Sequence, residues 1–161
     1  MIRALIFFLA VTVSCYSFKG ISIDPEVKTF TVSNVEDITS ASPANYALDF
    51  GYALSNKIRR ETRLNLDNNQ ADVRFDCKVT SFAVAAVAPV AGQPSAINRL
   101  TINLDVQFTD RKNEKNNWQK NFSRFEDFDA SQSLNSVQDK LISNINKLLL
   151  EDIFNAAFSN W

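Results

Sequence analysis

Two stretches of this sequence alternate between apolar and polar side chains, and that alternation limits the fold more than any other feature. Residues 72–80 and 100–109 each place an apolar side chain at every second position. These apolar positions are Val73, Phe75, Cys77 and Val79 in the first stretch, and Leu100, Ile102, Leu104, Val106 and Phe108 in the second. Because successive side chains of a strand point to opposite faces, both stretches are predicted to be strands of one sheet. That sheet should be covered on one face and polar on the other.

Two further segments complete the predicted sheet. Residues 27–32 (VKTFTV) are rich in β-branched side chains, which favour strands. Residues 118–125 follow a polar turn at 110–117 and carry Trp118 and Phe122 at matching parity. We therefore predict a sheet of about four strands.

Two segments have the spacing of amphipathic helices. The first is predicted over about residues 43–63, with Ser42 as the N-cap and Pro43 as the first helical residue. Its apolar stripe is Tyr46, Phe50, Leu54 and Ile58. The second is predicted over residues 133–158, and its apolar face is Val137, Leu141, Ile145, Leu148, Ile153 and Ala156. One apolar face on each element predicts an α+β two-layer sandwich, in the order β-α-β-β-β-α, with both helices on one face of the sheet.

Residues 1–14 have the pattern of a secretory signal. Arg3 precedes an apolar run at residues 4–13, which is far shorter than the roughly 20 residues that span a bilayer. The sequence TVSC at residues 12–15 resembles the lipobox of bacterial lipoproteins, although Thr12 stands where an aliphatic residue is usual. This resemblance implies that Cys15 carries lipid and begins the mature chain; the alternative is an ordinary signal peptide with a chance cysteine. We expect residues 15–161 to form a single periplasmic domain.

The composition argues against several functional classes. The chain has no histidine, so Ser-His-Asp catalysis, Cys-His catalysis and histidine-containing zinc sites cannot be assembled. Its formal net charge of -1 does not favour nucleic acid. If Cys15 is lipidated, Cys77 has no disulfide partner, and its strand parity predicts a buried structural thiol. We expect no enzyme activity, no cofactor and no bound metal.

Three segments are candidate sites, and each has a structural alternative. Residues 83–96 (AVAAVAPVAGQPSA) are apolar and contain turn-forming residues. Val87, Pro89 and Val90 are therefore candidate contacts for a partner or acyl chains; the alternative is a hairpin packed on the domain's own core. Arg111 and Lys112 are candidate contacts for lipid phosphates; the alternative is an exposed polar turn. The acidic cluster Glu126, Asp127 and Asp129 is interpreted as a structural connector into the last helix, whose N-terminus favours negative charge.

Four segments resemble a known family. These are CYSFKGISI, NRLTINLDVQFTD, FSRFEDFDASQSL and the ending EDIFNAAFSNW, which look like the LptE-type lipoproteins of the Bacteroidetes lineage. The resemblance implies a sheet backed by two helices, a lipid anchor in the outer membrane, and a role as plug and assembly subunit of the lipopolysaccharide translocon. It implies as partners an LptD-type outer-membrane β-barrel and lipopolysaccharide. The competing hypothesis is a lipid-anchored periplasmic module that binds a lipid or another small molecule.

The lipobox assignment predicts the behaviour of one variant. Cys15→Ala removes the sulfur that would take the lipid, so the protein should remain uncleaved or become soluble. Metabolic labelling with a fatty-acid probe checks this. Undiminished label in the variant would show that the lipid is not on Cys15.

Overall fold

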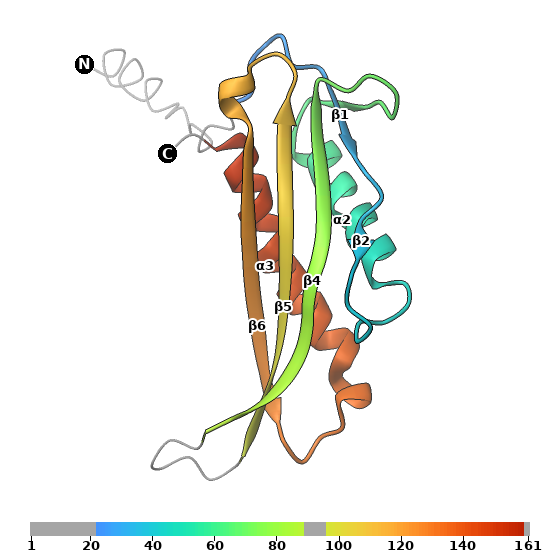
Figure 1. Cartoon of the computed structure of the whole chain (residues 1–161), viewed down its shortest axis with the longest axis vertical. Coiled ribbons are helices and arrows are strands. Elements are labelled where there is room, and N and C mark those ends of the chain that lie inside the picture. Colours follow the sequence, from blue (N-terminus) through green and yellow to red (C-terminus); the bar gives the residue numbers. More distant parts are fainter. Residues whose placement is uncertain (1–21, 89–95, 160–161) are drawn as a thin grey trace, which may run out of the picture.

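The computed structural model describes residues 22–88 and 96–159 and places a long sheet in front of two helices (Figure 1). The first half of the chain forms strands β1 (Thr29–Val32) and β2 (Glu36–Asp37), helix α2 (Tyr46–Glu61) and strand β3 (Asn65–Leu66). The second half forms strands β4 (Val73–Val87) and β5 (Ile97–Asp110), the short 3-10 helix η2 (Glu114–Asn116), strand β6 (Trp118–Asp129) and helix α3 (Leu134–Phe158).

Six strands of the described residues form one mixed sheet, in the order β3-β1-β4-β5-β6, with β2 paired to β4 beside β1. β4, β5 and β6 form an antiparallel meander. β1 runs parallel to both β3 and β4, and β2 runs parallel to β4. The predicted α+β class with two helices is confirmed, but the four-stranded sheet and the order β-α-β-β-β-α are wrong. The additional strands β2 and β3 contain two residues each, which is too short for any alternation to show in the sequence.

One face of the sheet and one stripe of each helix enclose a single core. Every apolar position predicted to face inward on β4, β5 and α2 is buried. Among the largest buried side chains, Phe30 and Phe75 come from the sheet, Phe50 from α2, and Leu149 from α3. Both helices therefore cover the same face, as the two-layer prediction required (Figure 1).

The long strands extend further than their alternation predicted. β4 continues to Val87 and β5 begins at Ile97, so the hairpin adds seven residues to the end of the first predicted strand and three to the start of the second. A β-bulge between Val79 and Ser81 shifts the register of β4, and Phe82 is the next buried side chain. Beyond Phe82 both faces of β4 are exposed, so pairing continues without the burial that would require an apolar-polar pattern.

The first helix begins three residues later than predicted. It starts at Tyr46 with Asn45 in the N-cap position and no side-chain cap. The hydroxyl of Ser42 donates instead to the carboxylate of Asp37, and the N–H of Tyr46 donates to the carbonyl of Pro43 in a turn that precedes the helix. A capping residue near a helix start can thus belong to the preceding loop.

The buried stripe of α3 differs from the predicted face at several positions. It also includes Phe154 and Phe158, whereas Val137 and Ala156 are half-buried. Leu149 is fully buried, whereas the predicted Leu148 is 42% exposed. Ile145, Leu149 and Ile153 follow one another at four-residue intervals, which keeps them on the same side of the helix. The two neighbouring leucines therefore face in different directions.

Cys77 is a buried free thiol, as its strand parity predicted. Burial, together with the nearby charge of Asp76, raises the pKa of this thiol to about 12. At neutral pH it stays protonated, which favours a packing role over a reactive one.

The register of α3 predicts different effects for two adjacent substitutions. Leu149→Ala removes a fully buried side chain and should lower the free energy of unfolding by about 2–5 kcal/mol. Leu148→Ala, its matched control, should change it by less than about 1 kcal/mol because that side chain is half-exposed. Urea unfolding measures both values. Equal losses in the two variants would contradict this helix register.

Candidate functional site

The side of β4, β5 and β6 that faces away from the helices, called here the open face, has no layer over it in the described structure. Its central positions carry mainly amides, hydroxyls and charged groups: Arg74, Asp76, Lys78, Thr101, Asn103, Asp105, Gln107, Gln119, Asn121 and Ser123. Two side-chain hydrogen bonds cross from β6 to β5, from Ser123 to Asn103 at 2.6 Å and from Gln119 to Asp105 at 2.7 Å. This face therefore suits a polar surface or water.

The charges of the open face are largely neutralised by pairs. The guanidinium of Arg74 lies 2.9 Å from Asp76, and the ammonium of Lys78 lies 3.0 Å from Glu36 on β2. Arg99 makes two hydrogen bonds to the carboxylate of Asp127, and these bonds raise the pKa of the guanidinium and lower that of the carboxyl. The face consequently presents polarity without a strong field of one sign.

The β4–β5 hairpin extends beyond the core as an exposed, mostly apolar arm. The hairpin arm, defined as residues 83–88 and 96–99, begins where Phe82 and Leu100 leave the core. Ala83 to Ala86 are all exposed, and half-buried Val87 pairs with Ile97. The alternative of a hairpin packed on the domain's own core is therefore wrong for residues 83–86. Pro89 and Val90 lie outside the described residues.

The guanidinium of Arg99 lies 3.7 Å from the ring centroid of Phe125, at the base of this arm on the open face. The ring is 49% exposed. A cation over an aromatic face is an attractive contact, so Arg99 partly covers the apolar ring.

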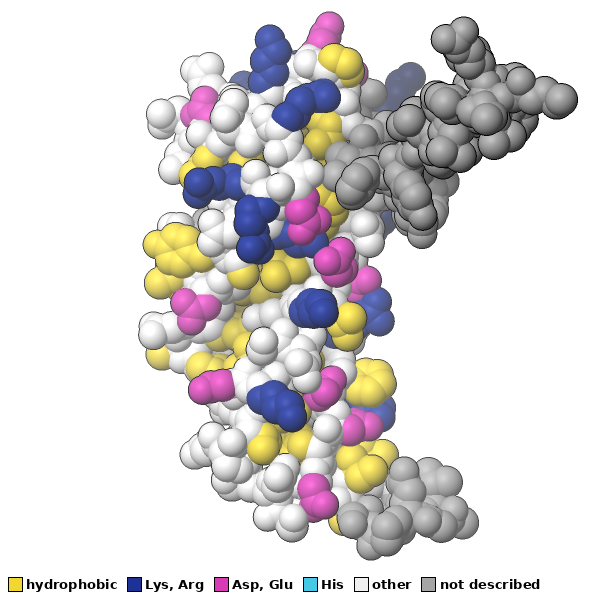
Figure 2. Space-filling view, turned by 180° about the vertical axis from the view of Figure 1, so that it is seen from behind, with side chains coloured by type: hydrophobic (Ala, Val, Ile, Leu, Met, Phe, Trp, Pro, Cys, Tyr) yellow, Lys and Arg dark blue, Asp and Glu magenta, His cyan; other side chains and the backbone are white. Residues whose placement is uncertain are grey.

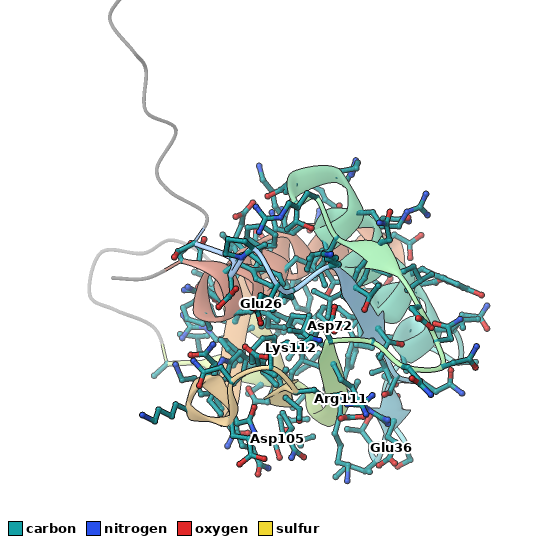
Figure 3. All side chains as sticks on the ribbon, turned by 90° about the horizontal axis from the view of Figure 1, so that it is seen from above. Glu26, Glu36, Asp72, Asp105, Arg111 and Lys112 are labelled. Atoms are coloured by element: carbon teal, nitrogen blue, oxygen red, sulfur yellow. The ribbon has the colours of Figure 1, made fainter. Side chains whose placement is uncertain are left out.

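Arg111 and Lys112 lie at the opposite end of the sheet from Val87. β5 runs for 13 residue steps from Ile97, the pairing partner of Val87, to Asp110, which precedes Arg111. These steps span about 44 Å at the rise of an extended strand. The two sets of candidate contacts are therefore separate surfaces. The ammonium of Lys112 lies 3.3 Å from the carboxylate of Asp72, and Figure 3 shows these two side chains together, seen along the long axis. Arg111 is exposed, and its backbone N–H donates to the carbonyl of Asp72.

Asp72 also connects this end of the sheet to the start of β1. The N–H of Lys28, at 2.9 Å, lowers the pKa of Asp72, and the N–H and hydroxyl of Thr29 and the ammonium of Lys112 add to this against the opposing effect of burial. The carboxylate therefore joins three segments of the chain, and one of its partners is a residue predicted to contact lipid.

The acidic cluster of the sequence lies on β6 and has structural partners. Asp127 pairs with Arg99, Glu126 accepts from the amide of Asn144 on α3, and Asp129 accepts from the N–H of Ser131. Its interpretation as structural holds, but it belongs to the strand and does not form a connector. Within residues 22–88 and 96–159, no group of acidic or cysteine side chains could hold a metal ion.

An open groove of about 880 Å³ lies between α2 and α3 on the other side of the molecule. Figure 2 shows this side, with charged side chains of both signs interspersed among apolar ones. The buried ammonium of Lys57 lies 2.8 Å from Glu61 and 2.7 Å from Glu151, and 5.0 Å from the ring centroid of Phe154. Burial opposes the charge of Lys57, but the hydrogen bonds to the two carboxylates raise its pKa overall. Sequence reasoning missed this pair because Lys57 and Glu151 lie 94 positions apart.

The described chain enters the domain beside the end of α3. The N–H of Ser22 donates to the carbonyl of Phe158 at 2.8 Å, and Arg63 donates to the carbonyls of Ile23 and Asp24. This end also carries the β5–β6 turn, whereas the hairpin arm lies at the far end (Figure 1). Neither described helix is both long enough and apolar enough to cross a membrane.

A family model for lipopolysaccharide assembly, LptE, matches residues 27–157. This chain belongs to the LptE family. The match confirms the family resemblance of the sequence, and the chain is a lipopolysaccharide-assembly lipoprotein of the Gram-negative envelope. No curated protein matches the chain in sequence.

Solved structures share the fold of this LptE chain at low identity. A minor lipoprotein from Acinetobacter baumannii is 14% identical over 80% of this chain and 91% of that one, with a TM-score of 0.52. A hypothetical protein from Chlamydia trachomatis is 10% identical over 83% of this chain and 99% of that one, also with a TM-score of 0.52. A neuraminyllactose-binding hemagglutinin homologue from Helicobacter pylori is 13% identical over 87% of this chain and 88% of that one, with a TM-score of 0.53. At these identities the similarity establishes the fold alone.

The Asp72 contacts predict a pH-dependent contribution to stability. Because the folded state lowers this pKa, the contribution is present above the unfolded value of about 3.9 and is lost as the pH falls through the folded value. Asp72→Ala should lower the free energy of unfolding at pH 7 by about 1.5–3 kcal/mol and reduce its dependence on pH below about 4. Lys112→Ala should cost less than about 1 kcal/mol, because its ion pair is solvent-exposed. Urea unfolding at several pH values tests both; equal losses would assign the effect to the ion pair instead of the backbone hydrogen bonds.

Proposed function

We propose that this LptE protein is anchored in the outer membrane by lipid on Cys15 and acts as the plug and assembly subunit of the lipopolysaccharide translocon. Its partner would be an LptD-type β-barrel. The observation that carries the proposal is the family match over residues 27–157. The polar open face supports it independently.

A plug has to fit the inside of a barrel, and the lumen of an outer-membrane barrel is polar. The open face offers amides, hydroxyls and paired charges over most of its length. Pairing limits the cost of bringing charged groups into an interface, because each cation keeps a carboxylate partner. These properties fit contact with a polar wall.

The two ends of the domain would have different roles. Ser22 lies seven residue steps after Cys15, so an anchor on Cys15 would lie within about 25 Å of the end of the domain at which α3 ends. The hairpin arm would then extend away from the anchor by the length of the sheet. We propose that Val87, Pro89 and Val90 of the 83–96 segment contact the barrel or acyl chains there.

At the end nearest the proposed anchor, Arg111 is the better of the two basic candidates for a lipid phosphate. Its side chain is exposed and has no ion pair within the described part of the chain, whereas Lys112 is paired with Asp72. Any contribution of Lys112 to binding would require that pair to open or be shared.

A second candidate function is a lipid-anchored module that binds a lipid or another small molecule. The 880 Å³ groove between α2 and α3 is the observation that favours it, because its size is typical of ligand sites. Stable co-purification with one barrel protein would favour the plug instead.

The plug hypothesis predicts a selective defect in assembly. Replacing Val87, Pro89 and Val90 together with Ser should weaken association with the barrel while the domain remains folded, because residues 83–86 of this hairpin are already exposed outside the core. Association is measured by affinity pull-down from detergent-solubilised outer membrane, and folding by circular dichroism. A control with Leu48 and Tyr52 replaced by Ser, which are exposed apolar residues on α2, should retain the barrel.

Two results would count against this proposal. Unfolding of the triple variant would mean that the distal hairpin belongs to the core. Normal barrel assembly and normal surface lipopolysaccharide in a deletion strain would remove the translocon role and favour the binding module.

A further inference from the structure

The outer side of β4, which faces away from β5, is paired over only part of its length in the described structure. β1 and β2 lie along it one after the other and pair with residues 73–75 and 78–79. The last of these contacts is the hydrogen bond that the N–H of Ile38 donates to the carbonyl of Val79. Residues 82–87 pair with β5, and no described strand lies on their other side (Figure 1). The outer side of residues 82–87 is here called the free edge.

Hydrogen bonds around Asp37 explain why β2 does not continue along β4. The carboxylate of Asp37 accepts from the N–H and the hydroxyl of Thr39, both at 2.8 Å, and from the hydroxyl of Ser42. Such contacts form a turn, which ends the strand. The chain then enters α2 in the helix layer, so the described chain has no segment that fills the place beside residues 82–87.

The register shows which residues direct their backbone groups to the free edge. The carbonyls of Phe75 and Val79, whose side chains face the core, accept hydrogen bonds from the β1–β2 side. The bulge adds one residue to β4 opposite Asn103, so the core-facing residues keep this direction beyond it. Phe82 is buried in the core and Val84 lies opposite buried Leu100. Their N–H and C=O groups therefore face outward, and they have no hydrogen-bond partner within residues 22–88 and 96–159.

The free edge lacks the features that usually protect an edge strand, which are charged side chains, proline and short length. Residues 81–88 (SFAVAAVA) contain no Asp, Glu, Lys, Arg or Pro. The bulge lies before Phe82, and the pairing from there to Val87 is regular. β6, at the opposite edge of the sheet, instead carries Lys120 and Arg124. The free edge is thus long enough, and open enough, to pair with a strand of ordinary length.

The chemistry of this edge determines what can occupy it. A row of backbone donors and acceptors at the spacing of a strand is matched by the backbone of another extended polypeptide. That strand would lie about 4.8 Å from β4 and place side chains on both faces of the sheet. It would meet Val84, which is 43% exposed, on the core side, and the exposed Ala83 and Ala85 on the open face. A charged side chain would lose water there without gaining a partner, so the occupant should be uncharged.

The position of Ser22 argues against a second copy of this chain as the occupant. Two copies joined through the same edge by a twofold axis would run antiparallel, with their Ser22 ends at opposite ends of the joined sheet. Two chains anchored through Cys15 in one membrane need these ends on the same side. Because this step rests on the proposed anchor, self-association is measured separately below.

We propose that the free edge binds an extended, uncharged segment of a partner polypeptide, which adds a strand beside β4 in line with β1 and β2. Backbone hydrogen bonds supply the affinity, and the small apolar side chains of the hairpin arm select against charge. Binding of such a segment requires neither the barrel nor lipopolysaccharide, so its failure would leave the translocon role untouched.

An NMR titration of the isotope-labelled full chain in detergent micelles tests the proposal. The probe is a capped seven-residue peptide in which Thr and Val alternate. The backbone amide signals of residues 82–87 should shift, with a dissociation constant on the order of 1 mM. A control peptide with proline at the centre lacks one N–H and cannot continue a ladder, so it should bind at least about fivefold more weakly.

Three substitutions at Val84 locate the binding. Val84→Pro removes an outward N–H and should weaken binding of the Thr-Val peptide by about fivefold or more. Val84→Lys keeps the backbone but places a charge at the edge, and it should also weaken binding. Val84→Thr, the matched control, keeps both the N–H and the branched side chain and should bind like the unsubstituted chain. Unchanged amide signals of β5 confirm that each variant retains the β4–β5 ladder.

Four outcomes would overturn the proposal. They are no peptide binding at about 10 mM, signal shifts only outside residues 82–87, equal binding of the proline peptide, and binding that Val84→Lys leaves unchanged. Sedimentation of the chain without peptide measures self-association. A dimer that Val84→Lys dissociates would assign the free edge to a second copy instead of a partner segment.

Discussion

The antiparallel pairing of β4 with β5 is the interaction on which the rest of this structure depends. It runs from Val73 opposite Asp110 to Val87 opposite Ile97, interrupted by one bulge. Because side chains alternate along both strands, this single ladder presents an apolar face to α2 and α3 and a polar face to the outside. A slip of one residue would exchange the two faces and expose Phe75 and Leu104, so burial of the core also determines which side chains are available to a partner.

The β4–β5 ladder also extends past the core, and this extension forms the hairpin arm that a partner could contact. The helices stop covering the hairpin after Phe82, but backbone pairing maintains the arm as an extended ribbon. A ribbon without a covering layer has little burial to stabilise it, so its pairing depends on continuity with the stable part of the ladder. The arm therefore continues the ladder up to Val87 and Ile97, and it places small apolar side chains at the end furthest from Ser22.

The parts of the fold that could be predicted are those where burial imposes a period on the sequence. The apolar positions of β4 and β5 and the stripe of α2 were predictable for this reason. The two-residue strands, the extension of β4 to Val87 and the late start of α2 were not, because they depend on pairing or loop contacts with no repeating pattern. The candidate site was predicted less completely. Composition left an exposed loop and a core-packed hairpin as open alternatives for residues 83–96. The pairings of Lys112 with Asp72 and of Lys57 with Glu151 arise between segments distant in sequence.

β6 is an edge strand of the described sheet, and its side chains favour binding of a partner to the open face over pairing of a strand along this edge. An exposed edge strand can pair with another chain, and inward-pointing charges are one way in which proteins prevent this. On β6, Lys120 and Arg124 share the parity of the core-facing Trp118 and Phe122. Arg124 extends to Asp152 of α3 at 2.6 Å, and Lys120 lies 5.3 Å from the ring centroid of Trp118. A strand added beside β6 would have to accommodate these charged side chains, whereas a partner on the open face would meet hydrogen-bonding groups that are already in place.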